Sequence, residues 1–130
     1  MVVDDDPRVL DATARLIEFV AGCEVRKFPN AAEALRAFEE APDAFPLVVT
    51  DLEMPGIDGL ELGRRISSLA RNVQLVLVTG NPFALDGIDV RRFGFGCVLG
   101  KPYSLQALRD ALDPAWKTPD TVSVSTATLF

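Results

Sequence analysis

Histidine is absent from the 130 residues of this chain. Its absence excludes an imidazole general base, a histidine ligand to a metal, and a phosphohistidine relay within the chain, because each of these needs an imidazole ring. Any acid, base, nucleophilic or metal-binding chemistry of these residues must therefore come from carboxylates, hydroxyls, amines or thiols.

Cysteine is also scarce: the chain has two, Cys23 and Cys97. Their spacing does not make a metal-binding or redox motif. We expect both to be small, buried, apolar residues of a reduced protein. We expect no disulfide between them, since the predicted strands that carry them lie at opposite edges of the sheet.

Basic residues are outnumbered, with 13 Lys and Arg against 19 Asp and Glu and a net charge of −6. This balance argues against a nucleic-acid partner or an anionic membrane surface, because both need a basic face. No apolar run reaches the roughly 18 residues of a membrane span. Acidic residues from position 4 onward exclude the apolar stretch of a signal peptide. We therefore expect a cytoplasmic location and no membrane contact.

The most informative stretch runs from Leu47 to Gly59. It begins as an apolar, β-branched run, which is typical of a strand buried on both faces of a parallel sheet. It then reaches Asp51 and Met54-Pro55-Gly56, which cannot continue a regular strand. A buried strand gains nothing from ending on a carboxylate. Ligands bind at the carboxyl ends of strands in open parallel α/β sheets, so Asp51 is a candidate site residue.

The rest of the chain alternates short apolar runs with amphipathic segments, and its size and hydrophobic content suit a single domain. The other predicted strands are 1–3, 23–28, 73–78 and 97–100. The apolar faces of the predicted helices include Leu10, Leu16, Ile17, Ala34, Phe38, Leu62, Ile66, Leu69, Leu105 and Leu108. Segment 82–93 stands where a further helix belongs, but Pro82 and Gly87 predict a short, irregular or mobile segment. The alternation predicts a parallel α/β sandwich with right-handed crossovers.

Polar residues that packing does not need follow the predicted strands. Asp4 and Asp5 follow the first, Asp51 ends the central one, Thr79 ends the next, and Lys101 follows the last. Because the carboxyl ends of parallel strands share one edge of the sheet, these residues should converge. Singly, each has an ordinary interpretation as a turn, a cap or a solvated surface charge. Jointly, they indicate a site.

Carboxylates that converge repel one another, at about 4 kcal/mol for a pair 4 Å apart at an effective dielectric constant near 20. Lys101 supplies one compensating charge, and a divalent cation is the natural second. Oxygen ligands without histidine or cysteine suit Mg²⁺. Such a site is suited to stabilising a transferring phosphoryl group. Asp51 is the best candidate nucleophile because it is central, whereas Asp4 and Asp5 are adjacent and suited to holding a metal.

These residues and their neighbours resemble the receiver domain of bacterial two-component response regulators, including the receivers of hybrid sensor histidine kinases. The resemblance covers residues 1–113 and is carried by Val2-Val-Asp-Asp-Asp-Pro7, Thr50-Asp-Leu-Glu-Met-Pro-Gly-Ile-Asp-Gly-Leu60, Val78-Thr-Gly80 and Lys101-Pro102. It implies a flavodoxin-like, doubly wound sheet of five parallel strands in the order 2-1-3-4-5, with helices on both faces.

The resemblance also implies a ligand set for Mg²⁺. Asp5 would bind the ion directly and Asp4 mostly through water. Asp51 and the backbone carbonyl of Glu53 would complete the protein ligands. The side chain of Glu53 has two interpretations: a solvated surface carboxylate, or a group that tunes the lifetime of the phosphoryl group.

In the same way, the resemblance implies that Asp51 accepts a phosphoryl group from a histidine kinase or its phosphohistidine domain. Thr79 would hydrogen-bond that group and Lys101 would pair with it. The chain departs from the family at Val98, three residues before the lysine, where an aromatic switch residue is common. A coupled shift of Thr79 and segment 82–93 is therefore the expected switch, with output to an effector domain or a homodimer through the 82–103 face.

Two other functions compete with a phosphoacceptor. A Mg²⁺-dependent phosphohydrolase of the haloacid dehalogenase type also uses an aspartyl nucleophile after a strand, but it has a second aspartate where Glu53 stands. A degenerate receiver would act only as a protein-binding module, and the full acidic set argues against it. As an isolated domain, a receiver catalyses only its own phosphorylation and dephosphorylation. Residues 114–130 are a tail that could be disordered, a linker remnant or an extra edge strand, and we favour a linker.

Overall fold

The computed structural model describes residues 1–113 and the backbone of residues 123–125. Its strands are β1 (Val2–Val3), β2 (Lys27–Phe28), β3 (Leu47–Asp51), β4 (Gln74–Thr79), β5 (Cys97–Gly100) and β6 (Ser123–Ser125). Its α-helices are α1 (Pro7–Ala21), α2 (Ala31–Glu40), α3 (Gly59–Leu69) and α4 (Leu105–Leu112). Three short 3₁₀ helices are η1 (Pro42–Ala44), η2 (Pro82–Leu85) and η3 (Val90–Phe93).

The strands form one parallel sheet with the order β2-β1-β3-β4-β5-β6. The predicted flavodoxin-like order 2-1-3-4-5 is confirmed, and β6 adds a strand beside β5. For residues 123–125, the structure therefore adopts the edge strand among the three alternatives for the tail. Residues 114–122 and 126–130 lie outside the described residues, so the division of the chain after residue 113 stays a prediction.

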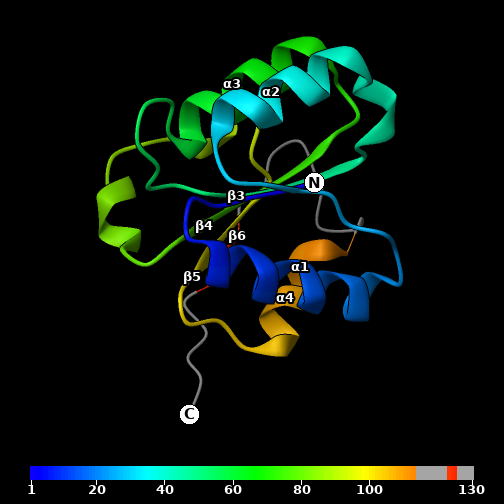
Figure 1. Cartoon of the computed structure of the whole chain (residues 1–130). Helices are drawn as coiled ribbons and strands as arrows, with labels where there is room; N and C mark the ends of the chain where they lie inside the picture. The colour runs from blue at the N-terminus through cyan, green and yellow to red at the C-terminus, as the bar shows by residue number, and fades with distance from the viewer. Residues whose placement is uncertain (114–122, 126–130) are drawn as a thin grey trace.

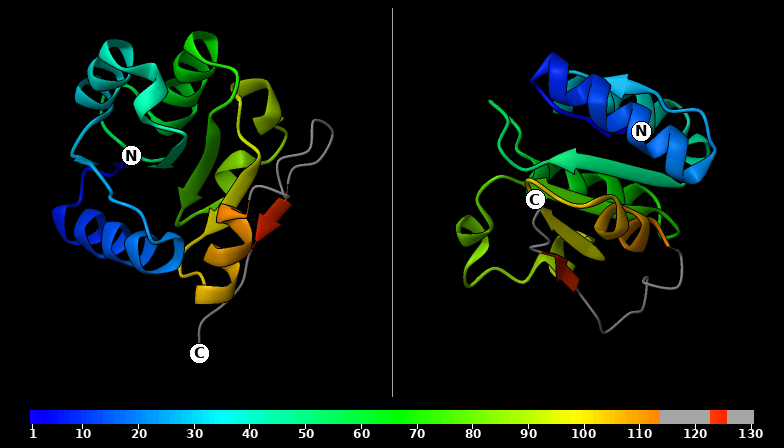
Figure 2. Two further views of the ribbon diagram at one scale, coloured as in Figure 1. Left: turned by 90° about the vertical axis from the view of Figure 1, so that its right-hand side faces the viewer. Right: turned by 90° about the horizontal axis from the view of Figure 1, so that it is seen from below.

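The helices cover both faces of the sheet, as the doubly wound fold requires (Figure 1). Helices α2 and α3 pack side by side on one face, and α1 and α4 pack together on the other. The left view in Figure 2 shows the same pairing, with α1 in blue beside α4 in orange. Within the described residues, no helix is long and apolar enough to cross a membrane.

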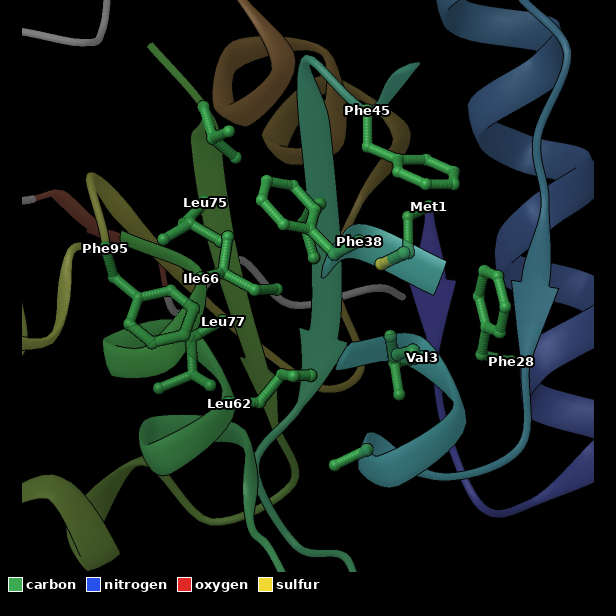
Figure 3. Close-up of a cluster of buried hydrophobic side chains, with 14 of the residues drawn as sticks. Met1, Val3, Phe28, Phe38, Phe45, Leu62, Ile66, Leu75, Leu77 and Phe95 are labelled. Carbon is green, nitrogen blue, oxygen red and sulfur yellow. The ribbon is translucent and has the colours of Figure 1, made fainter. Parts of the chain in front are cut away.

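The core under α2 and α3 contains most of the buried aromatic side chains (Figure 3). The rings of Phe38 and Phe45 stack with their centroids 6.1 Å apart, and Phe28 meets Phe45 edge-on at 6.3 Å. The guanidinium of Arg26 lies 5.2 Å from the ring centroid of Phe28. These contacts hold β2 and the segment that leads into β3 against α2.

Segment 82–93 contains no α-helix and consists of η2, η3 and a turn at Gly87, whose φ of 77° is left-handed. The prediction of a short, irregular segment is therefore confirmed. Gly87 accounts for the break because glycine weakens a helix and its φ here is left-handed, whereas Pro82 stands at the first position of η2, where proline is tolerated. Val90 is buried and anchors the segment, whereas the side chain of Phe83 is 79 % exposed.

Both cysteines are free thiols, as predicted, and the predicted burial is confirmed for Cys97 but wrong for Cys23. Cys23 is exposed and lies in the loop after α1 rather than in a strand. Cys97 is buried in β5, which has β4 on one side and β6 on the other and so is not an edge strand. The short β2 explains the error, because it begins only at Lys27.

We expect one thiol of the native protein to react quickly with iodoacetamide at neutral pH. Burial raises the pKa of Cys97 to about 11, so its reactive thiolate is scarce as well as inaccessible. Cys23 should therefore account for the fast labelling, and Cys97 should react only after unfolding in urea. Peptide mapping of the alkylated sites checks this, and fast labelling of Cys97 in the folded protein would contradict the described packing of β5.

Candidate phosphoacceptor site

The register of the sheet brings four strand ends to one edge. Val3 pairs with Thr50, Asp51 with Val78, and Thr79 with Gly100. The residues that end or follow these pairs are therefore neighbours, although they are far apart in the chain. This edge lies on the left in Figure 1, where β1 turns into α1 and where η2 follows β4.

An acidic cluster forms at this edge from Asp4, Asp5 and Asp51. One carboxylate oxygen from each of the three lies within 4.8 Å of the others. Asp4 and Asp51 are buried, with 5 % and 6 % of their surface exposed, while Asp5 is open to solvent. The backbone N–H of Asp6 donates to Asp4 Oδ1 at 2.9 Å and fixes that carboxylate. The convergence that the sequence predicts is thus present.

Lys101 reaches into the cluster from the end of β5. Its Nζ lies 3.0 Å from Asp51 Oδ1 and 3.5 Å from Asp4 Oδ2. Its backbone N–H donates to the carbonyl of Thr79 at 2.7 Å, so the main chain of the lysine is fixed to the neighbouring strand. The ammonium is aimed at the central carboxylate by the sheet itself.

The pKa values of Asp51 and Lys101 reflect two opposing effects: burial, and the attraction between their charges. Burial raises the pKa of Asp51, and the hydrogen bond and charge of Lys101 oppose that rise without cancelling it, while Asp4 and Glu53 add to it. Burial lowers the pKa of Lys101, but Asp51 and Asp4 outweigh it and the pKa is raised. One ammonium therefore does not neutralise the carboxylates gathered here, which leaves the site with excess negative charge.

The donor set fits a hard divalent cation. The three carboxylates offer only oxygen ligands, and the exposed Asp5 leaves one side of the cluster open to water and to an ion. Mg²⁺ is typically held by one or two carboxylates together with waters and phosphate oxygens. The residues present are therefore suited to Mg²⁺, and the loop that contains Glu53 begins beside them.

Thr79 is fully buried at the end of β4, and its hydroxyl is already occupied. Thr79 Oγ1 donates to Glu53 Oε1 at 2.6 Å, and it accepts from the backbone N–H of Asn81 at 3.0 Å. The side chain of Glu53 is exposed to solvent and also accepts this hydrogen bond from Thr79. In the sheet, Asp51 lies opposite Val78, the neighbour of Thr79, and Glu53 follows Asp51 by two residues, so the observed register brings the loop after β3 close to Thr79.

The loop from Leu52 to Asp58 is fixed at both ends. The N–H of Leu52 donates to the carbonyl of Val78 at 2.8 Å, and the N–H of Gly59 donates to the carbonyl of Leu52 at 3.0 Å. Asp58 caps α3 by accepting from the N–H of Glu61 at 2.9 Å. A Cβ at Gly59 would lie 2.2 Å from the carbonyl oxygen of Asp51, so this close approach requires glycine. Sequence analysis did not identify this contact.

Val98 is fully buried in the core of the sheet and pairs with Leu77. It belongs to the apolar cluster under α2 and α3. A small aliphatic side chain here cannot swing between a buried and an exposed position as a large aromatic ring can. Val98 was predicted to be a switch residue together with Thr79, and this stays a prediction; the structure shows only that its side chain is packed in the core.

A family model described as the response regulator receiver domain matches residues 1–113. This chain belongs to the response regulator receiver family. It is a receiver domain of two-component response regulators. The acidic cluster, Thr79 and Lys101 all lie within the matched residues. The match ends where α4 ends and does not include β6.

Known relatives and solved structures agree with this assignment. The C4-dicarboxylate transport transcriptional regulatory protein DctD of Rhizobium meliloti is 34% identical over 110 residues, which are 82% of this chain and 23% of that protein. The response regulator receiver protein CpdR of Brucella abortus is 29% identical over 113 residues, 87% of this chain and 92% of that protein. A receiver domain protein from Clostridium thermocellum superposes with a TM-score of 0.77 at 29% identity, over 85% of this chain and 86% of that chain.

This receiver domain spans about a quarter of DctD and most of CpdR. The relatives therefore include one long regulator that contains such a domain and one protein that is little more than the domain. The predicted resemblance to the receivers of hybrid kinases stays a prediction, since neither of these relatives is described as a kinase.

Proposed function

We propose that this receiver domain accepts a phosphoryl group on Asp51 from the phosphohistidine of a histidine kinase or phosphotransfer domain. The observation that carries the proposal is the ion pair of 3.0 Å between Lys101 and Asp51, made beside two further carboxylates at the sheet edge. A buried aspartate held by one lysine among like charges is poised for a reaction that brings in a phosphoryl group and a cation.

In the proposed reaction, a carboxylate oxygen of Asp51 attacks phosphorus. The new O–P bond forms as the P–N bond of the donor breaks, and its electron pair stays on the departing imidazole nitrogen. Lys101 stays close enough to pair with an oxygen of the transferred group. Thr79, at the end of the neighbouring strand, would donate a hydrogen bond from its hydroxyl to another oxygen of the transferred group. Later attack by water on the acyl phosphate releases inorganic phosphate and restores Asp51.

Mg²⁺ is the cofactor that the cluster suits; Asp5, Asp51 and the carbonyl of Glu53 would hold it, with Asp4 acting mostly through water. When bound, it would neutralise charge on the phosphoryl oxygens. Asp4 is held in place by the N–H of Asp6, and Asp5 is accessible, so the chain provides one fixed and one open carboxylate.

The partners follow from this proposal. The phosphoryl donor is a histidine kinase or its phosphohistidine domain. The output would pass from Thr79 into segment 82–93 and the 82–103 face, toward an effector domain or a second copy of the chain. DctD is described as a transcriptional regulatory protein, and we propose an effector of that kind as one possible output. Nucleic acid is not expected to bind the receiver domain itself, given its net charge of −6.

The contacts of Glu53 argue against a phosphohydrolase of the haloacid dehalogenase type. In such an enzyme, the residue two positions after the nucleophile is an aspartate that acts on the substrate, whereas Glu53 is engaged by the hydroxyl of Thr79. The convergence of Asp4, Asp51 and Lys101 argues equally against a degenerate receiver, since a pure binding module has no use for buried, mutually repelling carboxylates.

We expect millimolar Mg²⁺ to raise the melting temperature, because the ion relieves carboxylate repulsion in the folded state only. At ten times the dissociation constant, the stabilisation is about 1.4 kcal/mol, or a shift of roughly 3–6 °C. Thermal melts at constant ionic strength, with NaCl replacing MgCl₂, measure this shift. The Asp5→Asn variant should lose most of it, and an unchanged melting temperature for the wild type would contradict a metal site here.

A further inference from the structure

The hydroxyl of Thr79 has only one proton, and that proton is used. It is donated to Glu53 Oε1 over 2.6 Å, a short distance typical of a charge-assisted hydrogen bond. The hydroxyl oxygen also accepts the N–H of Asn81 at 3.0 Å. While both contacts last, Thr79 cannot donate a hydrogen bond to a phosphoryl group on Asp51.

The two partners of this hydrogen bond differ in their freedom to move. Thr79 is fully buried in the last position of β4, whereas Glu53 is exposed, between the buried Leu52 and Met54 of the loop after β3. Glu53 can therefore swing into solvent at little cost. Its carboxylate is negatively charged, as a phosphoryl group is. A phosphoryl group on Asp51 would therefore repel the nearby Glu53 carboxylate.

We propose that Glu53 is a positioning residue that holds the Thr79 hydroxyl in the resting state and competes with the phosphoryl group for it. This inference rests on the proposed function of Asp51. Phosphorylation of Asp51 would repel the Glu53 side chain and offer the Thr79 hydroxyl a new acceptor. Thr79 would then be released from its hydrogen bond to Glu53. The contact between Glu53 and Thr79 thus opposes activation and shortens the time that the domain spends in its active form.

The same hydroxyl connects the site to the output segment. The backbone N–H of Asn81 donates to Thr79 Oγ1, and Asn81 also occupies the position before η2, where its carbonyl accepts from the N–H of Ala84 at 3.0 Å. A turn of the Thr79 side chain toward Asp51 would remove the acceptor of the Asn81 N–H and disturb the first turn of η2. Glu53 therefore controls the position of Thr79 and, through Asn81, that of segment 82–93.

The test is a titration with beryllofluoride and Mg²⁺ of variants that separate charge from hydrogen bonding. Glu53→Gln removes the charge but keeps an acceptor for Thr79, whereas Glu53→Ala removes both. We expect Glu53→Ala to bind about three- to tenfold more tightly than the wild type, with Glu53→Gln intermediate. Glu39→Gln, on the exposed face of α2, is the matched control for loss of one negative charge and should bind as the wild type does.

The Thr79→Val background completes the cycle. Without the hydroxyl, Glu53→Gln and Glu53→Ala should bind beryllofluoride equally well, because only the charge remains to be removed. Equal affinities of the two Glu53 variants in the presence of Thr79 would overturn the proposal. A difference that persists in the Thr79→Val background would overturn it as well.

A second readout needs no ligand. In the unliganded protein, the Thr79 hydroxyl proton should give a slowly exchanging NMR resonance, which Glu53→Ala should lose. Absence of that resonance from the wild type would overturn the proposal even if beryllofluoride binds. If the resonance is present but the wild type does not bind beryllofluoride, the function proposed for Asp51 fails, and the competitive role of Glu53 fails with it.

Discussion

Replacing Asp51 by Asn is expected to abolish phosphorylation by acetyl phosphate and Mg²⁺. The amide lacks the nucleophilic carboxylate oxygen, and it also loses the ion pair of 3.0 Å with Lys101. The expected loss is complete within the detection limit of intact mass spectrometry, where the wild type gains one phosphoryl group. Binding of beryllofluoride should be lost in parallel, because that anion needs the same carboxylate.

The matched control is Asp86→Asn, which makes the same chemical change at an exposed aspartate beyond η2. This variant should be phosphorylated as the wild type is. Circular dichroism and thermal melts of both variants separate a chemical loss from unfolding. Phosphorylation of Asp51→Asn at the wild-type level would remove Asp51 from the proposed reaction.

Replacing Gly59 by Ala is expected to destabilise the domain by about 3 kcal/mol, at the upper end of typical overpacking costs. The added Cβ would lie 2.2 Å from the carbonyl oxygen of Asp51 and 2.9 Å from the Cα of Leu52. Both obstacles are backbone atoms that cannot rotate away. Helix propensity alone would favour Ala, so the sign of the effect tests the close approach directly. Urea denaturation measures it.

Because the displaced atom belongs to Asp51, the variant should also bind beryllofluoride more weakly than the wild type. Gly96→Ala is the control, since a Cβ there meets no atom within 4 Å and Gly96 has no positive φ. Its stability should stay within about 0.5 kcal/mol of the wild type. If Gly59→Ala proves as stable as Gly96→Ala, the described packing of α3 against the end of β3 is wrong.

The sequence predicted the fold because the strong signals were buried strands and their order along the chain. The runs at 47–51 and 74–79 are apolar, β-branched and bounded by residues that end strands, and both became central strands. Segment 82–93 was predicted to be irregular because Pro82 and Gly87 oppose a helix, and it contains only 3₁₀ turns.

Apolar periodicity predicted the helices better than it predicted which of their residues are buried. Leu16, Leu69 and Leu105 fall within the apolar stripes, yet they are 39–47 % exposed. A stripe read from spacing is wider than the strip of helix that the sheet covers, so residues at its margins stay open to solvent. The sixth strand was left undecided for a related reason, since a short tail of Thr, Ser and Val pairs only where an unpaired edge is available beside it.

The candidate site could be predicted as a set of residues but not as a set of contacts. Parallel topology alone brings Asp4, Asp51 and Lys101 to one edge, because strand ends of a parallel sheet coincide. The pairing of Thr79 with Glu53 depends on how the loop after β3 folds back. Side-chain rotamers in a loop are not determined by periodicity, so neither this contact nor the close approach of Gly59 follows from the pattern.

The most direct test of the account is to locate the phosphoryl group. The protein would be phosphorylated with acetyl phosphate and Mg²⁺ and then reduced with borohydride, which converts an aspartyl phosphate into homoserine. Tandem mass spectrometry of the peptides would then identify the modified residue. The account predicts homoserine at position 51 and unmodified aspartate at positions 4 and 5. Homoserine at Asp4 or Asp5, with Asp51 unmodified, would contradict it.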